Sequence, residues 1–290
     1  MSLVRSSKQS ILVTGSSGML GTDLGEQLSL KWGRENVILA DRLALDITQS
    51  DEVAQYLGSH SISCVVNAAA YTDVDKAETE RDQAWRLNAL GPKVLAEVAN
   101  ERGIPLVHFS TDYVFDGKGN TLLTEEDLPS PPEPNYYGET KLEGEKWVLR
   151  NPLNLVLRVQ WLYGKKRERF THLKNRAEFT PFSDQWGAPT WTVDVSRVTC
   201  ELIEKKAQGL FHFAYDDQAT WAEVFQFVCD EMGYATKLIP RKTYEVKLPA
   251  TRPLFGVMSN KKLLRQLGRD SMGSWKDSLK TFLHTTEVKS

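Results

Sequence analysis

The feature that most constrains this chain is a glycine-rich loop between an apolar run and a helical stretch. The run 11–15 (ILVTG) leads into the loop 14–21 (TGSSGMLG), and residues 19–30 have the apolar spacing of a helix. The loop glycines are spaced G-x-x-G-x-x-G. Glycines at a strand-to-helix turn let a phosphate group approach the backbone and the amides of the helix N-terminus. Tight packing of helix on strand would use the same glycines, so the loop alone leaves both interpretations open.

Apolar runs continue to alternate with helical stretches through the first half of the chain. Strands are predicted at 37–40, 64–70, 104–109 and 153–159, and helices at 51–57, 84–102 and 136–149. Strands that are apolar throughout are typical of a parallel sheet that is buried on both faces. The sequence therefore predicts an α/β fold with a Rossmann-like, doubly wound parallel sheet.

The second half of the chain has a looser pattern. Beyond Trp161 the apolar runs become short, and the segment Lys165–Arg176 is strongly basic. Further helices are predicted at 193–206, 221–232, 260–267 and 275–283. We therefore expect a smaller and less regular α/β domain beside the sheet.

Composition narrows the class of protein. Lys and Arg number 36 against 38 Asp and Glu, a formal net charge of −2, which gives no reason to expect a nucleic-acid or membrane partner. No apolar run approaches the roughly 18 residues that span a bilayer, and the first ten residues lack the apolar stretch of a secretory signal. The three cysteines form no CxxC pair, so we predict no metal site. A cytoplasmic protein is expected.

Tyr137 and Lys141 are four residues apart on a predicted helix and share one of its faces. A phenol has a pKa of about 10, and a neighbouring ammonium group lowers it. A tyrosine tuned in this way can act as a general acid toward a developing alkoxide. Alone, the spacing is also common on helices that carry an interfacial tyrosine and a solvated lysine.

Two other polar segments follow predicted strands. Ser110, Thr111 and Asp112 lie at the end of a strand, where open parallel sheets bind ligands, although such residues also cap helices and turns. Asp41 follows the second strand, where a carboxylate can bind an adenosine ribose, whereas the adjacent Arg42 would suit a 2′-phosphate. Each can also be a surface charge. The preference between NADH and NADPH therefore stays open, but the order of these motifs favours function.

At these residues the chain resembles the extended short-chain dehydrogenase/reductase superfamily, and within it the dTDP-4-dehydrorhamnose reductases. The matching segments are TGSSGMLG (14–21), LDIT (45–48), VVNAAAYTDVDKAE (65–78), HFSTDYVFDG (108–117), NYYGETKLEGEK (135–146), DQWGAPTW (184–191) and TRP (251–253). The resemblance implies reduction of the C4 keto group of dTDP-4-dehydro-L-rhamnose by NADPH or NADH. It also implies a dinucleotide-binding domain (1–165 and 190–214), a substrate-binding domain (166–189 and 215–290) and a homodimer.

The resemblance implies a role for each matching residue. Tyr137 would protonate the C4 oxygen, Lys141 would lower the pKa of Tyr137 and bind the nicotinamide ribose, and Thr111 would hydrogen-bond the carbonyl oxygen. The implied cofactor-binding residues are Gly15, Ser17, Gly18, Met19, Leu20, Asp41, Arg42, Asp46, Ile47, Ala68, Ala69, Ala70, Tyr137 and Lys141. The implied substrate-binding residues are Thr72, Val74, Thr111, Asp112, Trp161 and Arg252. Arg252 would bind the diphosphate, because a guanidinium group suits phosphate oxygens, although it can also be a surface residue.

The chain departs from the family pattern on the substrate side. Val159-Gln160-Trp161 stands where the family often has Thr-Ser-Trp or Ser-Ser-Trp, and Arg169-Phe170 stands where an Asn-Phe pair is usual. In some family members acidic residues bind magnesium at a dimer contact, but Lys280 occupies a position where an acid would be needed. The identity of the sugar is therefore less determined than the reaction.

Two alternatives to a reductase stay open, and so does the role of the basic run. The same superfamily includes nucleotide-sugar epimerases and dehydratases, which hold their cofactor tightly. A regulatory subunit similar to the beta subunit of methionine adenosyltransferase is the non-catalytic alternative. The basic run Lys165–Arg176 is either a flap that meets the diphosphate or a solvated helix face, and its place before DQWGAPTW favours the flap.

Overall fold

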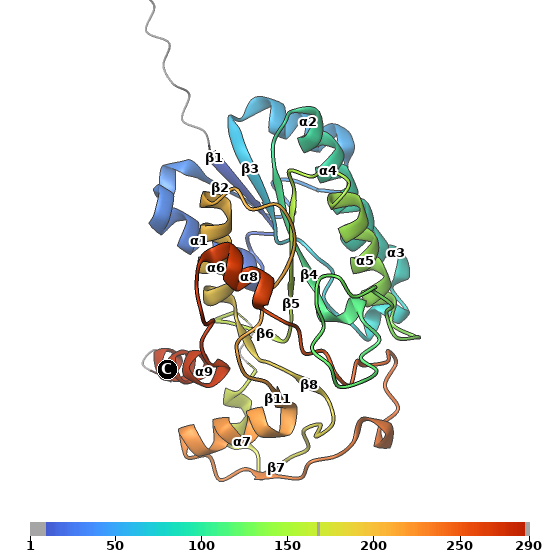
Figure 1. The fold of residues 1–290 in the computed structure, drawn as a ribbon, viewed down its shortest axis with the longest axis vertical. Helices are drawn as coiled ribbons and strands as arrows, with labels where there is room; N and C mark the ends of the chain where they lie inside the picture. The colour runs from blue at the N-terminus through green and yellow to red at the C-terminus, as the bar shows by residue number, and fades with distance from the viewer. Residues whose placement is uncertain (1–9, 167–168, 288–290) are drawn as a thin grey trace, which may run out of the picture.

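The computed structural model describes residues 10–166 and 169–287. Its centre is one six-stranded sheet with the strand order β10-β5-β4-β3-β1-β2, and every neighbouring pair is parallel (Figure 1). The strands are β1 (Ser10–Thr14), β2 (Val37–Ala40), β3 (Ile62–Asn67), β4 (Leu106–Thr111), β5 (Leu155–Val159) and β10 (Gly209–His212). All six residues of β4 are buried. The predicted α/β fold with a parallel sheet is confirmed.

Helices cover both faces of the sheet. On one face α1 (Met19–Trp32) packs against α6 (Thr192–Glu204), and α8 (Lys261–Leu267) contacts α6 and β10 (Figure 1). The helices α2 (Ser50–Ser59), α4 (Gly91–Glu101) and α5 (Tyr136–Val148) pack together on the other face. The two apolar layers are separate clusters, one around Leu24 and Leu157 and the other around Leu95 and Val156. The sheet is therefore doubly wound, as predicted.

Two differences between the predicted and the observed bounds of elements bear on the site. The predicted helix 84–102 is three segments: α3 (Arg81–Trp85), a π-helical turn (Arg86–Leu90) and α4. Pro92 lies in the first turn of α4 and has no N–H to continue a preceding α-helix. Strand β3 ends at Asn67, so Ala68, Ala69 and Ala70 lie beyond its carboxyl end instead of inside the strand.

Short elements form a smaller part of the molecule, drawn below the sheet in Figure 1. Its two-stranded sheets pair β7 (Glu178–Phe179) with β12 (Lys237–Leu238), and β8 (Trp186–Gly187) with β11 (Ala219–Thr220). Helix α7 (Trp221–Met232) begins at a capping box of Thr220 and Glu223. A third pair joins β6 (Leu162–Tyr163) to β9 (Thr190–Trp191). The division into two domains stays a prediction.

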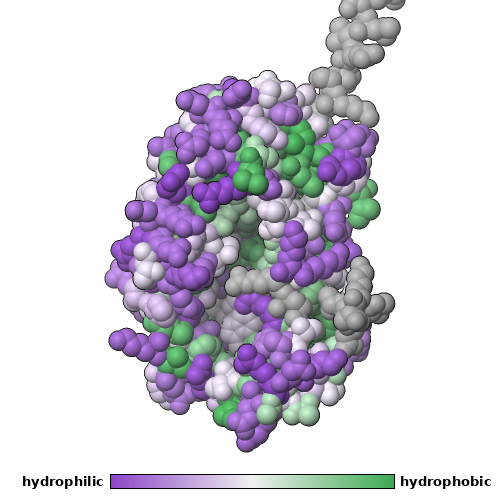
Figure 2. All heavy atoms as spheres, turned by 180° about the vertical axis from the view of Figure 1, so that it is seen from behind, coloured by the Kyte–Doolittle hydropathy of each residue, from purple (hydrophilic) through white to green (hydrophobic). Residues whose placement is uncertain are grey.

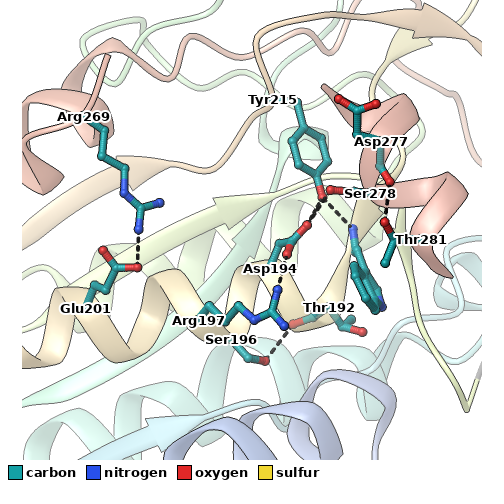
Figure 3. Close-up of polar contacts among 11 residues, drawn as sticks. Thr192, Asp194, Ser196, Arg197, Glu201, Tyr215, Arg269, Asp277, Ser278 and Thr281 are labelled. Atoms are coloured by element: carbon teal, nitrogen blue, oxygen red, sulfur yellow. Dashed lines mark hydrogen bonds and ion pairs between the residues drawn. The ribbon is translucent and has the colours of Figure 1, made fainter. Parts of the chain in front are cut away.

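A carboxylate on α6 connects the sheet layer to the last helix, α9 (Trp275–Glu287). Asp194 accepts hydrogen bonds from the Tyr215 hydroxyl at 2.8 Å and the Ser278 hydroxyl at 2.6 Å, and it pairs with Arg197 at 3.3 Å (Figure 3). These contacts fix the position of α9 relative to α6. Within the described residues, no helix combines the length and the apolar character needed to cross a bilayer.

Candidate active site

A cavity of about 570 Å³ lies beyond the carboxyl ends of β1, β3, β4 and β5. The molecular surface is hollowed between the part that carries the sheet and the smaller part (Figure 2). Thirteen of the predicted site residues line this cavity: Ser17, Gly18, Met19, Leu20, Ala68, Ala70, Thr72, Val74, Thr111, Asp112, Tyr137, Lys141 and Trp161. Carboxyl ends of parallel strands meet at one edge of the sheet, which brings residues distant in sequence together.

The glycine loop forms one wall of the cavity. Gly15 has φ +66°, and a Cβ atom there would lie 2.5 Å from the amide nitrogen of Ala69. A Cβ atom at Gly21 would lie 2.2 Å from the Gly15 carbonyl oxygen. Gly18 caps α1 without a side-chain hydrogen bond from the described residues. Because the loop is tight and the helix N-terminus carries no side-chain cap, its amides suit an anion.

Tyr137 lies in the first turn of α5, and Thr111 is the last residue of β4. The side chain of Asn135 caps α5 by accepting a hydrogen bond from the Gly138 amide at 2.7 Å. A Cβ atom at Gly138 would lie 2.3 Å from the Tyr113 carbonyl oxygen, so glycine lets α5 approach the end of β4 closely. The rings of Tyr137 and Tyr113 meet edge to face with centroids 5.7 Å apart.

Lys141 is buried beneath the cavity, with 3% of its surface exposed. Its Nζ atom donates a hydrogen bond to the Phe109 carbonyl oxygen at 2.5 Å and lies 3.4 Å from Nε2 of His108. Burial lowers the pKa of Lys141 to about 8, and the nearby Glu145 carboxylate opposes this shift. Burial, together with the charge of Lys141, holds the pKa of His108 well below its ordinary value.

Asp112 is also buried, with 2% of its surface exposed, and its Oδ1 atom accepts a hydrogen bond from the Thr111 hydroxyl at 3.1 Å. Burial raises the pKa of this carboxyl group to about 7. A Cβ atom at Gly256 would lie 2.6 Å from Oδ2 of Asp112, so the glycine makes room for the carboxyl group. Asp112 therefore titrates near neutral pH beside the hydroxyl of Thr111.

Aromatic and cationic side chains form another part of the cavity wall. Trp161 has φ +44° and stacks on Trp221, with ring centroids 4.0 Å apart. Lys166 and Arg169, from the basic run, line the same cavity, and Lys166 donates a hydrogen bond to the Ser17 carbonyl oxygen at 2.8 Å. These positions place cationic groups beside the glycine loop, and the flap remains a prediction.

Four predicted adenosine-side residues lie away from the main cavity. Arg42 and Asp46 line a second cavity of about 270 Å³ together with Arg86. Oδ1 of Asp41 accepts hydrogen bonds from the amides of residues 43 and 44 at 3.0 and 3.1 Å, so this carboxylate stabilises the turn after β2. Ile47 is buried.

Arg252 does not line the cavity of about 570 Å³, which we call the catalytic cavity. Its guanidinium group pairs with Asp75 at 2.8 Å and donates a hydrogen bond to the Ala250 carbonyl oxygen at 2.8 Å. The predicted contact with diphosphate would therefore compete with Asp75.

Sequence analysis gave no site role to six residues of the cavity wall: Phe109, Tyr113, Val159, Gln160, Leu162 and Trp221. Tyr113 is inside a motif that was recognised, and Gln160 is at a recognised departure from the family pattern. Trp221 was expected only as the start of a helix, and nothing in its spacing connects it with Trp161.

The family model described as "RmlD substrate binding domain" matches residues 9–288 of this sequence. The chain belongs to this family.

Relatives in the family match over nearly their full lengths. The chain is 36% identical over 281 residues to a "Probable dTDP-4,6-dihydroxy-2-methyloxan-3-one 4-ketoreductase" of Streptomyces antibioticus, covering 93% of this chain and 92% of the relative. It is 34% identical over 264 residues to the "dTDP-4-dehydrorhamnose reductase" of Salmonella typhimurium, covering 84% of this chain and 87% of the relative. A solved dTDP-4-dehydrorhamnose reductase of Bacillus anthracis in complex with NADP superposes with a TM-score of 0.89 at 31% identity, covering 96% and 99% of the two chains.

Proposed function

We propose that this chain reduces the C4 keto group of dTDP-4-dehydro-L-rhamnose to the hydroxyl of dTDP-L-rhamnose, with NADPH or NADH as the reductant. The observation that carries the proposal is the single cavity that Thr111, Tyr137 and Lys141 share with the glycine loop. The names of the relatives support the same reaction class, because each describes reduction of a keto group on a dTDP sugar or a dTDP-linked ring. The chain is therefore an oxidoreductase.

The residues present fit a dinucleotide. The glycine loop packs so closely against the backbone of Ala68 and Ala69 that a Cβ atom at Gly15 would clash with it, and the small side chains of Ala68 and Ala70 line the cavity beside the loop. Gly18, Met19 and Leu20 would hold the pyrophosphate, and Lys141 and Tyr137 would bind the nicotinamide end. The cofactor supplies the hydride when it is bound. Asp41, Arg42, Asp46 and Ile47 remain the proposed adenosine-side residues.

The chain's own residues supply the proton and hold the sugar. Tyr137 donates its phenolic proton to the C4 oxygen as negative charge develops there, which a general acid does at a gain of about 100- to 10,000-fold. Thr111 donates a hydrogen bond to the same oxygen, which requires its hydroxyl to leave Asp112. Lys141, when charged, stabilises the phenolate that remains on Tyr137.

Substrate-side residues surround the reacting carbon. Trp161 and Trp221 provide an apolar face for the sugar ring, with Thr72, Val74 and Asp112 on the remaining wall. Lys166 and Arg169 would meet the diphosphate, and Arg252 would join them only by releasing Asp75. We place the reaction in the cytoplasm, assign the segments 166–189 and 215–290 to a substrate-binding domain, and propose a homodimer.

The test is loss of nicotinamide absorbance with dTDP-4-dehydro-L-rhamnose generated in place, run separately with NADPH and NADH. Turnover with formation of dTDP-L-rhamnose supports the proposal. An epimerase or dehydratase would instead retain NAD through purification and give no net loss of absorbance. Cofactor binding without turnover of this sugar would contradict the proposal and favour another sugar or a regulatory subunit.

A further inference from the structure

Gln160 occupies the wall of the catalytic cavity immediately after β5. Only 2% of its surface is exposed, and the next residue, Trp161, adopts the left-handed backbone conformation with φ +44°. A tryptophan in that conformation is strained, and such strain is typical of functional sites. Gln160 and Trp161 both line the same cavity.

The carboxamide of Gln160 has no hydrogen-bond partner among the described residues, at either Oε1 or Nε2. The hydroxyl of Ser110, which lines the same cavity, also lacks a partner within that part of the chain. A buried polar group without a partner costs free energy, because it has lost its hydrogen bonds to water. A carboxamide with both of its polar atoms unpaired therefore indicates a ligand that completes it.

The structure makes room for this side chain. A Cβ atom at Gly187, in β8, would lie 2.8 Å from Oε1 of Gln160 and 2.8 Å from the ring of Trp161. A side chain at that position would push both residues away. Gly187 therefore permits the buried position of the carboxamide.

Gln160 lies away from the proposed pyrophosphate site. The glycine loop and the alanine segment follow β1 and β3, whereas Gln160 follows β5, on the far side of β4. Val159 is in register with Thr111, so Gln160 lies one residue beyond the level of the proposed carbonyl ligand. Gln160 therefore lies at the reacting end of the cavity, beside the place proposed for the keto carbon.

The hydrogen-bonding groups of a carboxamide indicate which part of the sugar nucleotide Gln160 would contact. It offers one acceptor and two donors, which match hydroxyl groups that both donate and accept, while a diphosphate accepts only. Lys166 and Arg169 already bring positive charge to this cavity for a diphosphate. The stacked Trp161 and Trp221 provide an apolar face for a sugar ring beside Gln160.

We propose that Gln160 is a specificity-determining residue that hydrogen-bonds the ring hydroxyl groups of the sugar whose C4 keto group faces Thr111 and Tyr137. This inference rests on the proposed function. The carboxamide would therefore select the arrangement of sugar hydroxyls that this chain accepts.

The test compares Gln160→Leu with the wild-type protein. We expect KM for the keto sugar and Kd for dTDP-L-rhamnose to rise by about tenfold, which corresponds to the loss of one or two hydrogen bonds. The Kd values for dTDP and for NADPH should not change, because neither molecule contains the ring of the keto sugar and its hydroxyl groups. The melting temperature of the ligand-free protein should stay the same or rise, because the variant removes an unsatisfied buried amide.

Gln185→Leu is the matched control. Gln185 is buried like Gln160, but its Nε2 atom donates a hydrogen bond to the Thr243 hydroxyl at 3.0 Å, and it lies outside the catalytic cavity. This variant should lower the melting temperature and leave KM unchanged. A ligand-binding role of Gln160 therefore predicts a raised KM without a lower melting temperature in Gln160→Leu, and a lower melting temperature without a raised KM in Gln185→Leu.

Two results would overturn the inference. Unchanged affinity of Gln160→Leu for dTDP-L-rhamnose would exclude a sugar contact, and an equal loss of affinity for dTDP or NADPH would assign Gln160 to another part of the ligands. The wild-type protein distinguishes this failure from failure of the proposed function. If the wild-type protein binds dTDP-L-rhamnose no better than dTDP and reduces no keto sugar, both proposals fail together.

Discussion

The Nε2 atom of His108 lies 3.4 Å from Nζ of Lys141, inside the sheet and out of contact with solvent. The hydrogen bonds around His108 determine which of its ring nitrogens carries the proton. Oδ1 of Asn67 accepts from the amide of Ala69 and the hydroxyl of Thr14, so its Nδ2 must donate to Nδ1 of His108. A neutral imidazole then carries its proton on Nε2, facing Lys141. This arrangement favours the uncharged amine of Lys141.

Replacing His108 should change the pKa of Lys141. His108→Gln offers Lys141 a carbonyl oxygen as acceptor, which stabilises the ammonium group and raises the pKa of Lys141 above about 8. The alkaline limb of the pH profile of kcat/KM should move upward by roughly one unit. The other groups around Lys141, Tyr137 and the Glu145–Arg158 pair, stay as they are. An alkaline limb that does not move in His108→Gln would refute the proposed tautomer, and His108→Leu controls for packing.

Tyr137→Phe removes the proposed proton donor and keeps the ring. We expect kcat to fall by about 100- to 10,000-fold, the range for loss of a general acid. The Kd for NADPH, measured by fluorescence titration, should change little. Tyr113→Phe is the control, because Tyr113 contacts Tyr137 ring to ring and also lines the cavity. Full activity of Tyr137→Phe would contradict the mechanism.

Asp112→Asn tests the raised pKa of Asp112. The folded protein holds the proton up to about pH 7, whereas the unfolded chain releases it near the ordinary value of 3.8. The carboxyl group therefore contributes most stability below pH 4, and this contribution is lost as the pH rises toward 7. Each unit of pKa difference corresponds to about 1.4 kcal/mol. Asparagine does not titrate, so the free energy of unfolding of the variant, relative to wild type, should increase between pH 4 and pH 8.

Urea unfolding at both pH values measures this difference. A gap between variant and wild type that is the same at pH 4 and pH 8 would show that Asp112 titrates normally in the folded protein.

Arg42 and Arg86 should set the affinity of the protein for NADPH. Both line the second cavity, and Arg86 donates a hydrogen bond to the Thr48 hydroxyl at 3.3 Å. Two guanidinium groups there would bind a 2′-phosphate, so Arg42→Ala and Arg86→Ala should each raise KM for NADPH by about tenfold or more. KM for NADH should not rise. Arg81→Ala is the matched control, since Arg81 is on α3 but pairs with Glu78 outside this cavity. Equal effects on both cofactors would contradict a 2′-phosphate site.

The buried pair of Glu145 and Arg158 supports α5 one turn beyond Lys141. Both side chains are about 2% exposed, and their closest atoms are 2.7 Å apart. Glu145→Gln leaves a buried guanidinium group without its counter-charge and should lower the free energy of unfolding by about 3–5 kcal/mol. Glu143→Gln, which breaks an exposed pair with Lys146 on the same helix, should cost less than about 1 kcal/mol. Similar losses in the two variants, measured by urea unfolding, would contradict this ranking.

The sequence predicted the parts of the site that depend on strand ends. Thr111 and the glycine loop were found because polar or small residues after buried strands converge at one edge of a parallel sheet. Tyr137 was found from its four-residue spacing to Lys141 on a helix. The unpaired carboxamide of Gln160 could not be found in this way, because hydrogen-bond satisfaction depends on neighbours that are distant in sequence. The same holds for Trp221, which reaches Trp161 only through the packing of α7.

The bounds of some elements were also beyond sequence reasoning. Strand β10 is four residues long and pairs in parallel with β5, more than forty residues earlier, so its short apolar run gave no separate signal. Gly91, the residue after the π-helical turn, packs so closely against Ile47 that a Cβ atom there would lie 2.6 Å from the Ile47 side chain, a contact that the sequence spacing does not reveal.

The sheet order has a consequence for synthesis on the ribosome. Strand β5 acquires its outer neighbour only when β10 emerges, after the chain has passed through β6 to β9. Until then one edge of the nascent sheet presents unpaired peptide groups and an apolar strand, the kind of surface from which aggregation begins. Pausing of translation between β5 and β10 would therefore expose this protein to chaperones for longer than pausing anywhere after β10.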